Sequence, residues 1–203
     1  MLQRLYIHNF KTFQNFELKP EGRHSSLLLG KNGAGKSSVA HALRLLQSVG
    51  RGVNRVGQLV TPRHFFGGHT AAPMRLEVDV VLQGQNFRYS LALELPEKFK
   101  ELRVLEERLE CEGHTVYERA QAQVSLRKLP DAAAGDARFL VDWHLVALPL
   151  ICSSPLLGRS SRPIRLSRVL LPEPDSPTTA TYSPFGTEKL TSFSAWTAVS
   201  PLP

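Results

Sequence analysis

A glycine-rich stretch, Gly30-Lys31-Asn32-Gly33-Ala34-Gly35-Lys36-Ser37, carries the residue types that can hold phosphate groups. It fits the pattern G-x-x-x-x-G-K-[ST] at every fixed position. Glycines let the backbone turn tightly and approach phosphates closely, and the N–H groups at the start of a helix face a bound anion. The stretch therefore predicts a phosphate-binding loop for a nucleoside triphosphate, although the pattern alone does not distinguish ATP from GTP.

Two side chains of this loop have predicted roles in the chemistry. Lys36 is expected to reach the β- and γ-phosphate oxygens, and the Ser37 hydroxyl is expected to bind the Mg²⁺ that bridges those phosphates. No catalytic residue is predicted. The predicted nucleotide-binding residues are Gly30, Lys31, Asn32, Gly33, Ala34, Gly35, Lys36, Ser37 and Ser38, with Ser37 as the metal ligand.

The segments on either side of the loop are those expected to position it. The apolar run Leu27-Leu28-Leu29 predicts a short buried strand before the loop. After it, apolar residues recur at helical spacing, namely Val39, Ala42, Leu43, Leu46 and Val49. This order of strand, loop and helix favours a nucleotide site over the alternative, a glycine-rich turn that merely starts a helix.

Two more strands are predicted upstream, over residues 4–10 and 13–19, joined by a tight hairpin at Lys11-Thr12. The N-terminus resembles that of the RecF, SMC and SbcC-like ATPases. The resemblance rests on a first strand ending Asn9-Phe10-Lys11, a second strand, and then the run from Leu29 to Ser38, which contains the motif NGAGKSS. These ATPases belong to the ABC-type ATPase group, and the chain is similar in particular to small prokaryotic proteins called AAA family ATPases. The resemblance is strongest over residues 1–50 and extends by pattern to about residue 150.

The resemblance implies an α/β fold, that of a P-loop NTPase, with an ABC-type ATPase head lobe and an antiparallel β-meander. It implies ATP and Mg²⁺ as ligands, a head-to-head dimer around the nucleotide, DNA as a partner, and a role in DNA repair, DNA maintenance or phage defence. In similar heads an arginine placed like Arg51 or Arg55 senses DNA or nucleotide. The plainer interpretation of these two arginines is a solvated helix C-terminus, where cations suit the helix dipole.

Hydrolysis in the resembling family requires an apolar strand that ends Asp-Glu and a serine-glycine signature. Asp79 and Asp142 each follow apolar residues, but neither is followed by an acid, and Leu157-Gly158-Arg159-Ser160-Ser161 matches the signature poorly. The sequence therefore predicts the N-terminal half of an ATPase head, with weak ATP binding and little or no hydrolysis. A partner head or a second chain is the expected source of the missing half.

Two other functions compete with this hypothesis. One is a non-enzymatic fragment or interaction module in which the loop is vestigial, which the missing Asp-Glu strand favours. The other is a GTPase or kinase built on the same loop. It is less favoured, because the sequence contains no guanine-reading Asn-Lys-x-Asp and no arginine-rich lid.

An antiparallel β-meander is predicted over residues 76–128. Its strands are expected at 76–82, 87–95, 102–111, 115–119 and 124–128, although Leu102, Leu105 and Leu109 also fit helical spacing. Residues 139–148 are predicted as the last core segment. The clustered glutamates Glu106, Glu107, Glu110 and Glu112 are interpreted as solvated ion pairs with Arg103 and Arg108 rather than as catalytic groups. The seven histidines show no defensible metal-ligand spacing.

Composition indicates a globular unit followed by a different kind of segment. The chain has 203 residues, a formal charge of +7 and only two cysteines; with no signal peptide and no apolar run long enough to span a bilayer, a cytoplasmic protein is expected. The basic balance suits either nucleic acid or an ordinary basic surface. Residues 1–150 are predicted to form the ATPase head, and residues 151–203, rich in Pro, Ser and Thr, a disordered tail or a diverged reading frame.

Overall fold

The computed structural model describes residues 1–23, 25–97, 99–127, 137–153 and 198–199. Most of the segment after residue 153, for which a disordered tail or a diverged reading frame is predicted, lies outside the described residues. The strands are β1 (Leu2–Phe10), β2 (Phe13–Leu18), β3 (Leu27–Leu28), β4 (Met74–Leu82), β5 (Gln85–Glu94), β6 (Arg103–Cys111), β7 (His114–Ala120), β8 (Gln123–Leu126), β9 (Ala137–Leu140) and β10 (Ala198–Val199). The helices are α1 (Lys36–Gly50), α2 (Val56–Leu59) and α3 (Leu148–Ser153), with short 3₁₀ turns η1 (Pro62–His64) and η2 (Phe66–Gly68).

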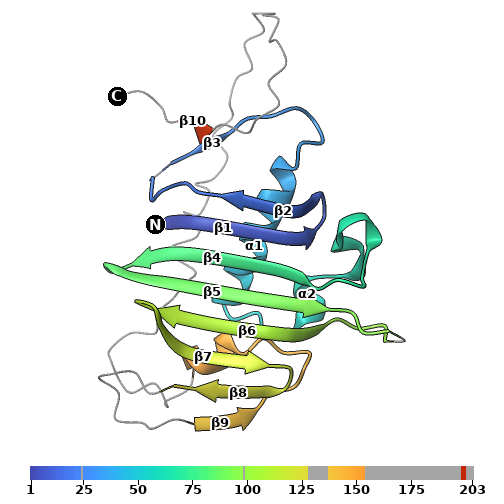
Figure 1. Cartoon of the computed structure of the whole chain (residues 1–203), viewed down its shortest axis with the longest axis vertical. Coiled ribbons are helices and arrows are strands. Elements are labelled where there is room, and N and C mark those ends of the chain that lie inside the picture. The colour runs from blue at the N-terminus through green and yellow to red at the C-terminus, as the bar shows by residue number, and fades with distance from the viewer. Residues whose placement is uncertain (24, 98, 128–136, 154–197, 200–203) are drawn as a thin grey trace, which may run out of the picture.

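Eight of the strands form one antiparallel sheet in the order β2-β1-β4-β5-β6-β7-β8-β9 (Figure 1). The predicted hairpin between β4 and β5 is confirmed, with Val78 opposite Tyr89. Its two turn residues, Gln83 and Gly84, have φ of +51° and +82°, and positive φ at both turn positions is typical of the tight turns that match strand twist. The predicted meander is therefore confirmed, and the helical alternative for the segment around Leu105 is excluded because that residue lies in β6.

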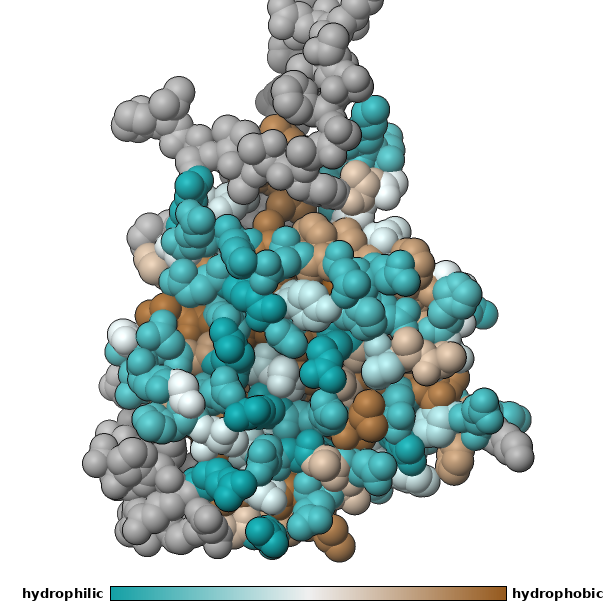
Figure 2. Space-filling view, in the orientation of Figure 1, coloured by the Kyte–Doolittle hydropathy of each residue, from teal (hydrophilic) through white to brown (hydrophobic). Residues whose placement is uncertain are grey.

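The two faces of the sheet differ in polarity because side chains alternate along each strand. On β4 the residues Met74, Leu76, Val78, Val80 and Leu82 are all buried on the inner face. Helices α1 and α2 lie behind this face in Figure 1. The outer face, turned toward the viewer, is largely hydrophilic in Figure 2. The sheet is thus a one-sided layer whose helices pack on the inner face alone in the part of the chain that the structure describes.

Helix α1 carries the loop and packs its apolar stripe against the sheet. Val39, Ala42, Leu46 and Val49 are buried at helical spacing, which confirms the predicted helix. At 15 residues, the helix is about 22 Å long. The phosphate loop and the C-terminal end of α1 therefore lie at opposite ends of the inner layer.

The prediction that the strand before the loop is buried is wrong. Leu27 and Leu29 are 57% and 56% exposed, and β3 spans two residues that pair only with β10 in a separate two-stranded sheet. Periodicity and apolar content show that a segment is able to be buried, but burial also requires elements that cover it on both sides. Within the described residues, no strand of the main sheet pairs with β3.

Residues 141–148 tie the far end of α1 to the sheet. Val56 N donates to His144 O at 2.8 Å, Val146 N donates to Asn54 O at 2.7 Å, and Val104 N donates to Trp143 O at 2.9 Å. Val141, Val146, Ala147 and Leu148 are buried. The predicted last core segment, residues 139–148, is confirmed in part: Leu140 and Trp143 are exposed, and the core continues to Ile151, which is 2% exposed. The segment bridges the loop after α1 and the strand β6.

Candidate functional site

The backbone of the phosphate loop adopts conformations that favour glycine. Gly33 has φ of +82° and Gly35, the residue that caps α1, has φ of +93°. A Cβ atom at Gly35 would lie 2.5 Å from Phe13 Cζ, which is closer than real Cβ contacts. Both the dihedral and the close approach therefore require glycine at position 35.

Lys36 folds back over the loop that precedes it. Its Nζ donates to Gly30 O at 2.6 Å and to Lys31 O at 2.8 Å. An ammonium group has three N–H donors, so these two bonds hold the charge in the loop and leave a third donor for an incoming phosphate oxygen. The side chain predicted to bind phosphate is therefore already positioned at the loop.

The two serines that follow Lys36 point into different surroundings. Ser37 is exposed in the first turn of α1, whereas Ser38 is buried. The Thr12 hydroxyl, from the β1–β2 turn, donates to Ser38 Oγ at 3.1 Å. Ser37 is thus the hydroxyl that is free to face a metal–phosphate group, while Ser38 anchors the loop to the first hairpin.

The start of α1 also suits an anion. Gly35 offers no side-chain cap, and no acidic residue lies in the first turn. The N-terminal N–H groups and the positive end of the helix dipole are therefore not screened by a carboxylate of that turn. Together with Lys36, this arrangement can hold the phosphates of a nucleotide. It repels a cation that arrives without an anion.

The structure brings to the loop two residues that the motif search missed. Thr12 bonds to Ser38, and Phe13 packs against Gly35 while its ring stacks on Phe16 with centroids 4.2 Å apart. The sequence pattern predicts Thr12 in the hairpin turn and indicates no contact between that turn and the loop. The available signal was the phenylalanine pair next to that turn, but it does not say which element the pair meets.

A family model described as "AAA domain, putative AbiEii toxin, Type IV TA system" matches residues 25–139, more than half of the chain. The chain belongs to this AAA-domain family. The matched range includes the whole loop 30–38, α1 and the sheet from β4 to β8, so a P-loop nucleotide-binding ATPase domain is shown. A search of curated proteins found no match.

In this AAA-domain chain, neither aspartate considered for Mg²⁺ lies near the loop. Asp79 is on the outer face of β4, where its carboxylate binds Arg88 Nε and Nη2 at 2.9 Å each. Asp142 accepts from His144 N at 3.0 Å and belongs to the segment that meets the C-terminal end of α1. Among the described residues, no group of three or more His, Cys, Asp or Glu is placed to hold a metal ion.

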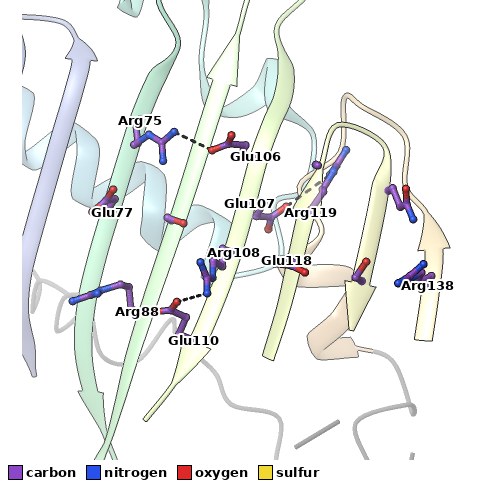
Figure 3. A pocket seen from close by; sticks show the side chains of 14 residues that line it. Arg75, Glu77, Arg88, Glu106, Glu107, Arg108, Glu110, Glu118, Arg119 and Arg138 are labelled. Atoms are coloured by element: carbon purple, nitrogen blue, oxygen red, sulfur yellow. Dashed lines mark hydrogen bonds and ion pairs between the residues drawn. The ribbon is translucent and has the colours of Figure 1, made fainter. Parts of the chain in front are cut away.

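A polar depression of about 690 Å³ lies over the outer face of the sheet (Figure 3). Five arginines and five glutamates line it, so its formal charge balances. Several of the arginines are ion-paired: Arg75 of β4 with Glu106 of β6, and Arg108 with Glu110 along β6, both at 2.9 Å. Exposed ion pairs of this kind form a polar surface and contribute little to stability.

The interpretation of the clustered glutamates is confirmed only in part. Glu110 is ion-paired with Arg108 on the outer face, as predicted, whereas Glu106 pairs there with Arg75 and Glu112 accepts a hydrogen bond from Asn86 N. Glu107 points to the inner face and is 1% exposed. Its carboxylate accepts from Tyr89 and Tyr117 hydroxyls at 3.0 and 2.7 Å and from Ala147 N and Leu148 N at 2.7 and 2.9 Å. The prediction failed because strand alternation, and not local charge, decides which side chain is buried.

Arg119 completes the cluster around Glu107. Its guanidinium lies 3.7 Å from the Glu107 carboxylate, and both side chains are fully buried. Burial lowers the pKa of Arg119, while the Glu107 charge opposes that shift. Arg119 also donates to the carbonyls of Gln121, Asp142 and Leu145. Because each of its three nitrogens donates to a backbone carbonyl, Arg119 together with Glu107 fastens residues 142–148 to the sheet.

No described helix of the chain is both long and apolar enough to cross a membrane.

Proposed function

We propose that the chain binds ATP with Mg²⁺ at the loop Gly30–Ser38. The observation that carries this proposal is the position of Lys36, whose ammonium lies at the loop with one donor to spare, at the uncapped start of α1. The exposed Ser37 hydroxyl fits a hard cation, since Mg²⁺ takes oxygen ligands. Mg²⁺ held by this hydroxyl would neutralise charge on the phosphates.

Each residue of the loop contributes to binding in a defined way. Gly33 and Gly35 shape the backbone so that its N–H groups approach the phosphates. Lys36 supplies the fixed positive charge. Ser38 and Thr12 hold the first turn of α1 in place, so that the donors are oriented before the nucleotide arrives.

We further propose that this unit works as an ABC-type head of the RecF/SMC/SbcC-like group, in DNA repair, DNA maintenance or phage defence with DNA as partner. The support is the N-terminal hairpin that contacts the loop, together with the segment at β3, where Leu27 of the strand and Leu29 after it are exposed and suit coverage by further polypeptide. A partner head or a second chain would then supply the groups for hydrolysis. Alone, the chain is expected to bind ATP and turn it over slowly or not at all.

Thermal unfolding with and without Mg-ATP tests the binding proposal. A ligand that binds only the folded state at 100 times its Kd stabilises that state by about 2.7 kcal/mol, which raises the Tm. Lys36→Ala should remove this rise. Lys19→Ala removes an equally charged but exposed side chain that pairs with Glu17. This variant should show the same rise in Tm with Mg-ATP as the parent chain.

Two results would count against the proposal. One is a chain whose Tm does not respond to Mg-ATP; the other is a Lys36→Ala variant that responds as strongly as the parent chain. The rise in Tm with Mg-GTP, measured in parallel, shows whether the site prefers adenine or guanine nucleotides. Phosphate release during the same incubation tests the expected lack of turnover, and rapid release would contradict it.

A further inference from the structure

Charge is distributed very unevenly along the chain. From Gly22 to Leu76 the sequence contains no Asp or Glu, although it contains eight Lys and Arg residues. Four of its arginines, Arg44, Arg51, Arg55 and Arg63, have no ion-pair partner among the described residues, whereas the arginines of the main sheet are largely paired. Arg51 and Arg55 follow the C-terminal end of α1, where cations suit the helix dipole, but Arg44 lies near other basic side chains and needs a different explanation.

Four basic side chains converge beside the phosphate loop. The rings of His41, on α1, and His64, on η1, lie with centroids 4.8 Å apart. Both pack on Phe10, at 5.6 and 5.9 Å between centroids, and Lys11 Nζ lies 6.0 Å from the same Phe10 ring. Arg44 is one helical turn beyond His41 on the same side of α1.

The backbone fixes this cluster. Lys11 N donates to His64 O at 2.6 Å, so the β1–β2 turn and η1 move together. His41 follows the exposed Ser37 by four residues and therefore lies on the same face of α1, one turn further along. The cluster is adjacent to the predicted metal–phosphate position but separate from the loop.

The electrostatics of the cluster are those of a site that lacks an anion. Partial burial lowers the pKa of both histidines, and the nearby Lys11 lowers both further. His64 and Arg44 add to the shift at His41. No carboxylate among the described residues pairs with any of the four, so positive groups face one another without compensation.

We propose that Lys11, His41, Arg44 and His64 form a second anion site that takes a phosphate group. A metal ion does not fit, because Lys11 and Arg44 repel a cation and because Nδ1 of His64 accepts a bond from Thr61 N at 3.2 Å. With Nδ1 accepting, the proton of the neutral ring is on Nε2. A bound phosphate supplies the missing negative charge and acceptor oxygens.

The phosphate group has two possible sources, a nucleotide held by the loop or the backbone of a nucleic acid. In both, phosphate favours the protonated form of His41, so binding takes up a proton and strengthens from pH 8 to pH 6. His64 keeps Nδ1 as the acceptor from Thr61 N and offers its Nε2–H to the phosphate. Binding of a nucleic-acid phosphate does not require a nucleotide at the loop, so this source can be tested where the loop is disabled.

The experiment has two arms that separate the sources. In the first, binding of a fluorescent DNA oligonucleotide is measured by anisotropy to the Lys36→Ala chain, at pH 6 and pH 8. In the second, Mg-ATP affinity is measured by calorimetry on the otherwise unchanged chain at the same pH values. Each arm compares Arg44→Gln and His41→Gln with Arg127→Gln, which removes one positive charge from an exposed pair on the sheet.

A loss of affinity of at least about tenfold for Arg44→Gln in either arm, with a smaller pH dependence of affinity for His41→Gln, supports the site. The arm in which affinity is lost identifies the source of the phosphate. Equal effects for Arg44→Gln and Arg127→Gln, or no effect in both arms, overturn it. Because Arg44 is exposed, its variant is expected to fold. Binding of oligonucleotide by the Lys36→Ala chain would stand even if the chain failed to bind ATP, so the two proposals fail separately.

Discussion

The Thr12 hydroxyl donates a hydrogen bond to Ser38 Oγ at 3.1 Å, and this bond joins the β1–β2 turn to the first turn of α1. Residues far apart in the sequence thereby set the position of the phosphate loop. The hairpin is outside the range that matches the AAA-domain family model, yet it contacts the most conformationally demanding residue of the loop, Gly35.

Removing this bond should weaken both folding and nucleotide binding. Thr12→Val keeps the side-chain shape but leaves the buried Ser38 hydroxyl without its donor, at an expected cost of about 1 kcal/mol in the free energy of unfolding. Mg-ATP affinity should fall as the loop loses its anchor. Urea unfolding and calorimetry measure the two effects.

Thr115→Val is the matched control for Thr12, since Thr115 bonds Arg108 on the exposed outer face. It should change neither quantity by more than a few tenths of a kcal/mol. If Thr12→Val likewise changed neither the free energy of unfolding nor the Mg-ATP affinity, the hairpin would have no role in positioning the loop.

Gly35→Ala should disrupt the loop more severely. The new Cβ would meet Phe13 Cζ at 2.5 Å in a backbone with φ of +93°, and an L-residue held there costs at least about 1 kcal/mol. We expect a lower Tm and no measurable Mg-ATP binding.

Gly57→Ala provides the comparison, because its Cβ would meet no atom within 4 Å and alanine favours the helix α2. This variant should be as stable as the parent chain or slightly more so. Normal ATP binding by Gly35→Ala would contradict the assigned loop geometry.

Glu107→Gln tests the buried cluster. An amide in place of the carboxylate leaves the buried Arg119 without its counter-charge and turns one acceptor into a donor that faces other donors. The expected loss in the free energy of unfolding is about 3 kcal/mol, measured by urea unfolding.

Glu106→Gln serves as the control on the neighbouring, exposed position, where its ion pair with Arg75 should contribute well under 1 kcal/mol. A double variant, Glu107→Gln with Arg119→Met, should recover part of the loss, because it removes the unpaired buried charge. Equal losses for Glu106→Gln and Glu107→Gln would disprove the buried pair.

Stability should fall as the histidine pair becomes protonated. The pKa of His41 and of His64 is lowered in the folded chain from the usual value of 6.5. The unfolded chain therefore takes up protons first as pH falls below about 6.5, and folding loses stability from there downward. His41→Gln should reduce the loss of Tm between pH 7 and pH 5.5.

The exposed His114, the first residue of β7, offers a control, and His114→Gln should follow the parent chain across the same pH range. The pair would be irrelevant to acid stability if His41→Gln and the parent chain showed the same pH profile.

The sequence by itself determined the features that depend on neighbours along the chain. The phosphate loop, the amphipathic helix α1 and the β4–β5 hairpin follow from glycine spacing, a 3.6-residue period and strict alternation around a two-residue turn. The same local rules predicted the run of strands from β4 to β8. For these elements the interactions that select the conformation are short in sequence.

Only the tertiary structure decided which elements cover which residues. Pairing of β1 with β4 merged the first hairpin and the meander into one sheet and brought Thr12 to Ser38. The same sheet turned Glu107 inward under residues 147–148, while Leu27 stayed exposed beside the loop. Burial depends on contacts between segments far apart in the chain. Local patterns in a single sequence do not show which of these segments come into contact.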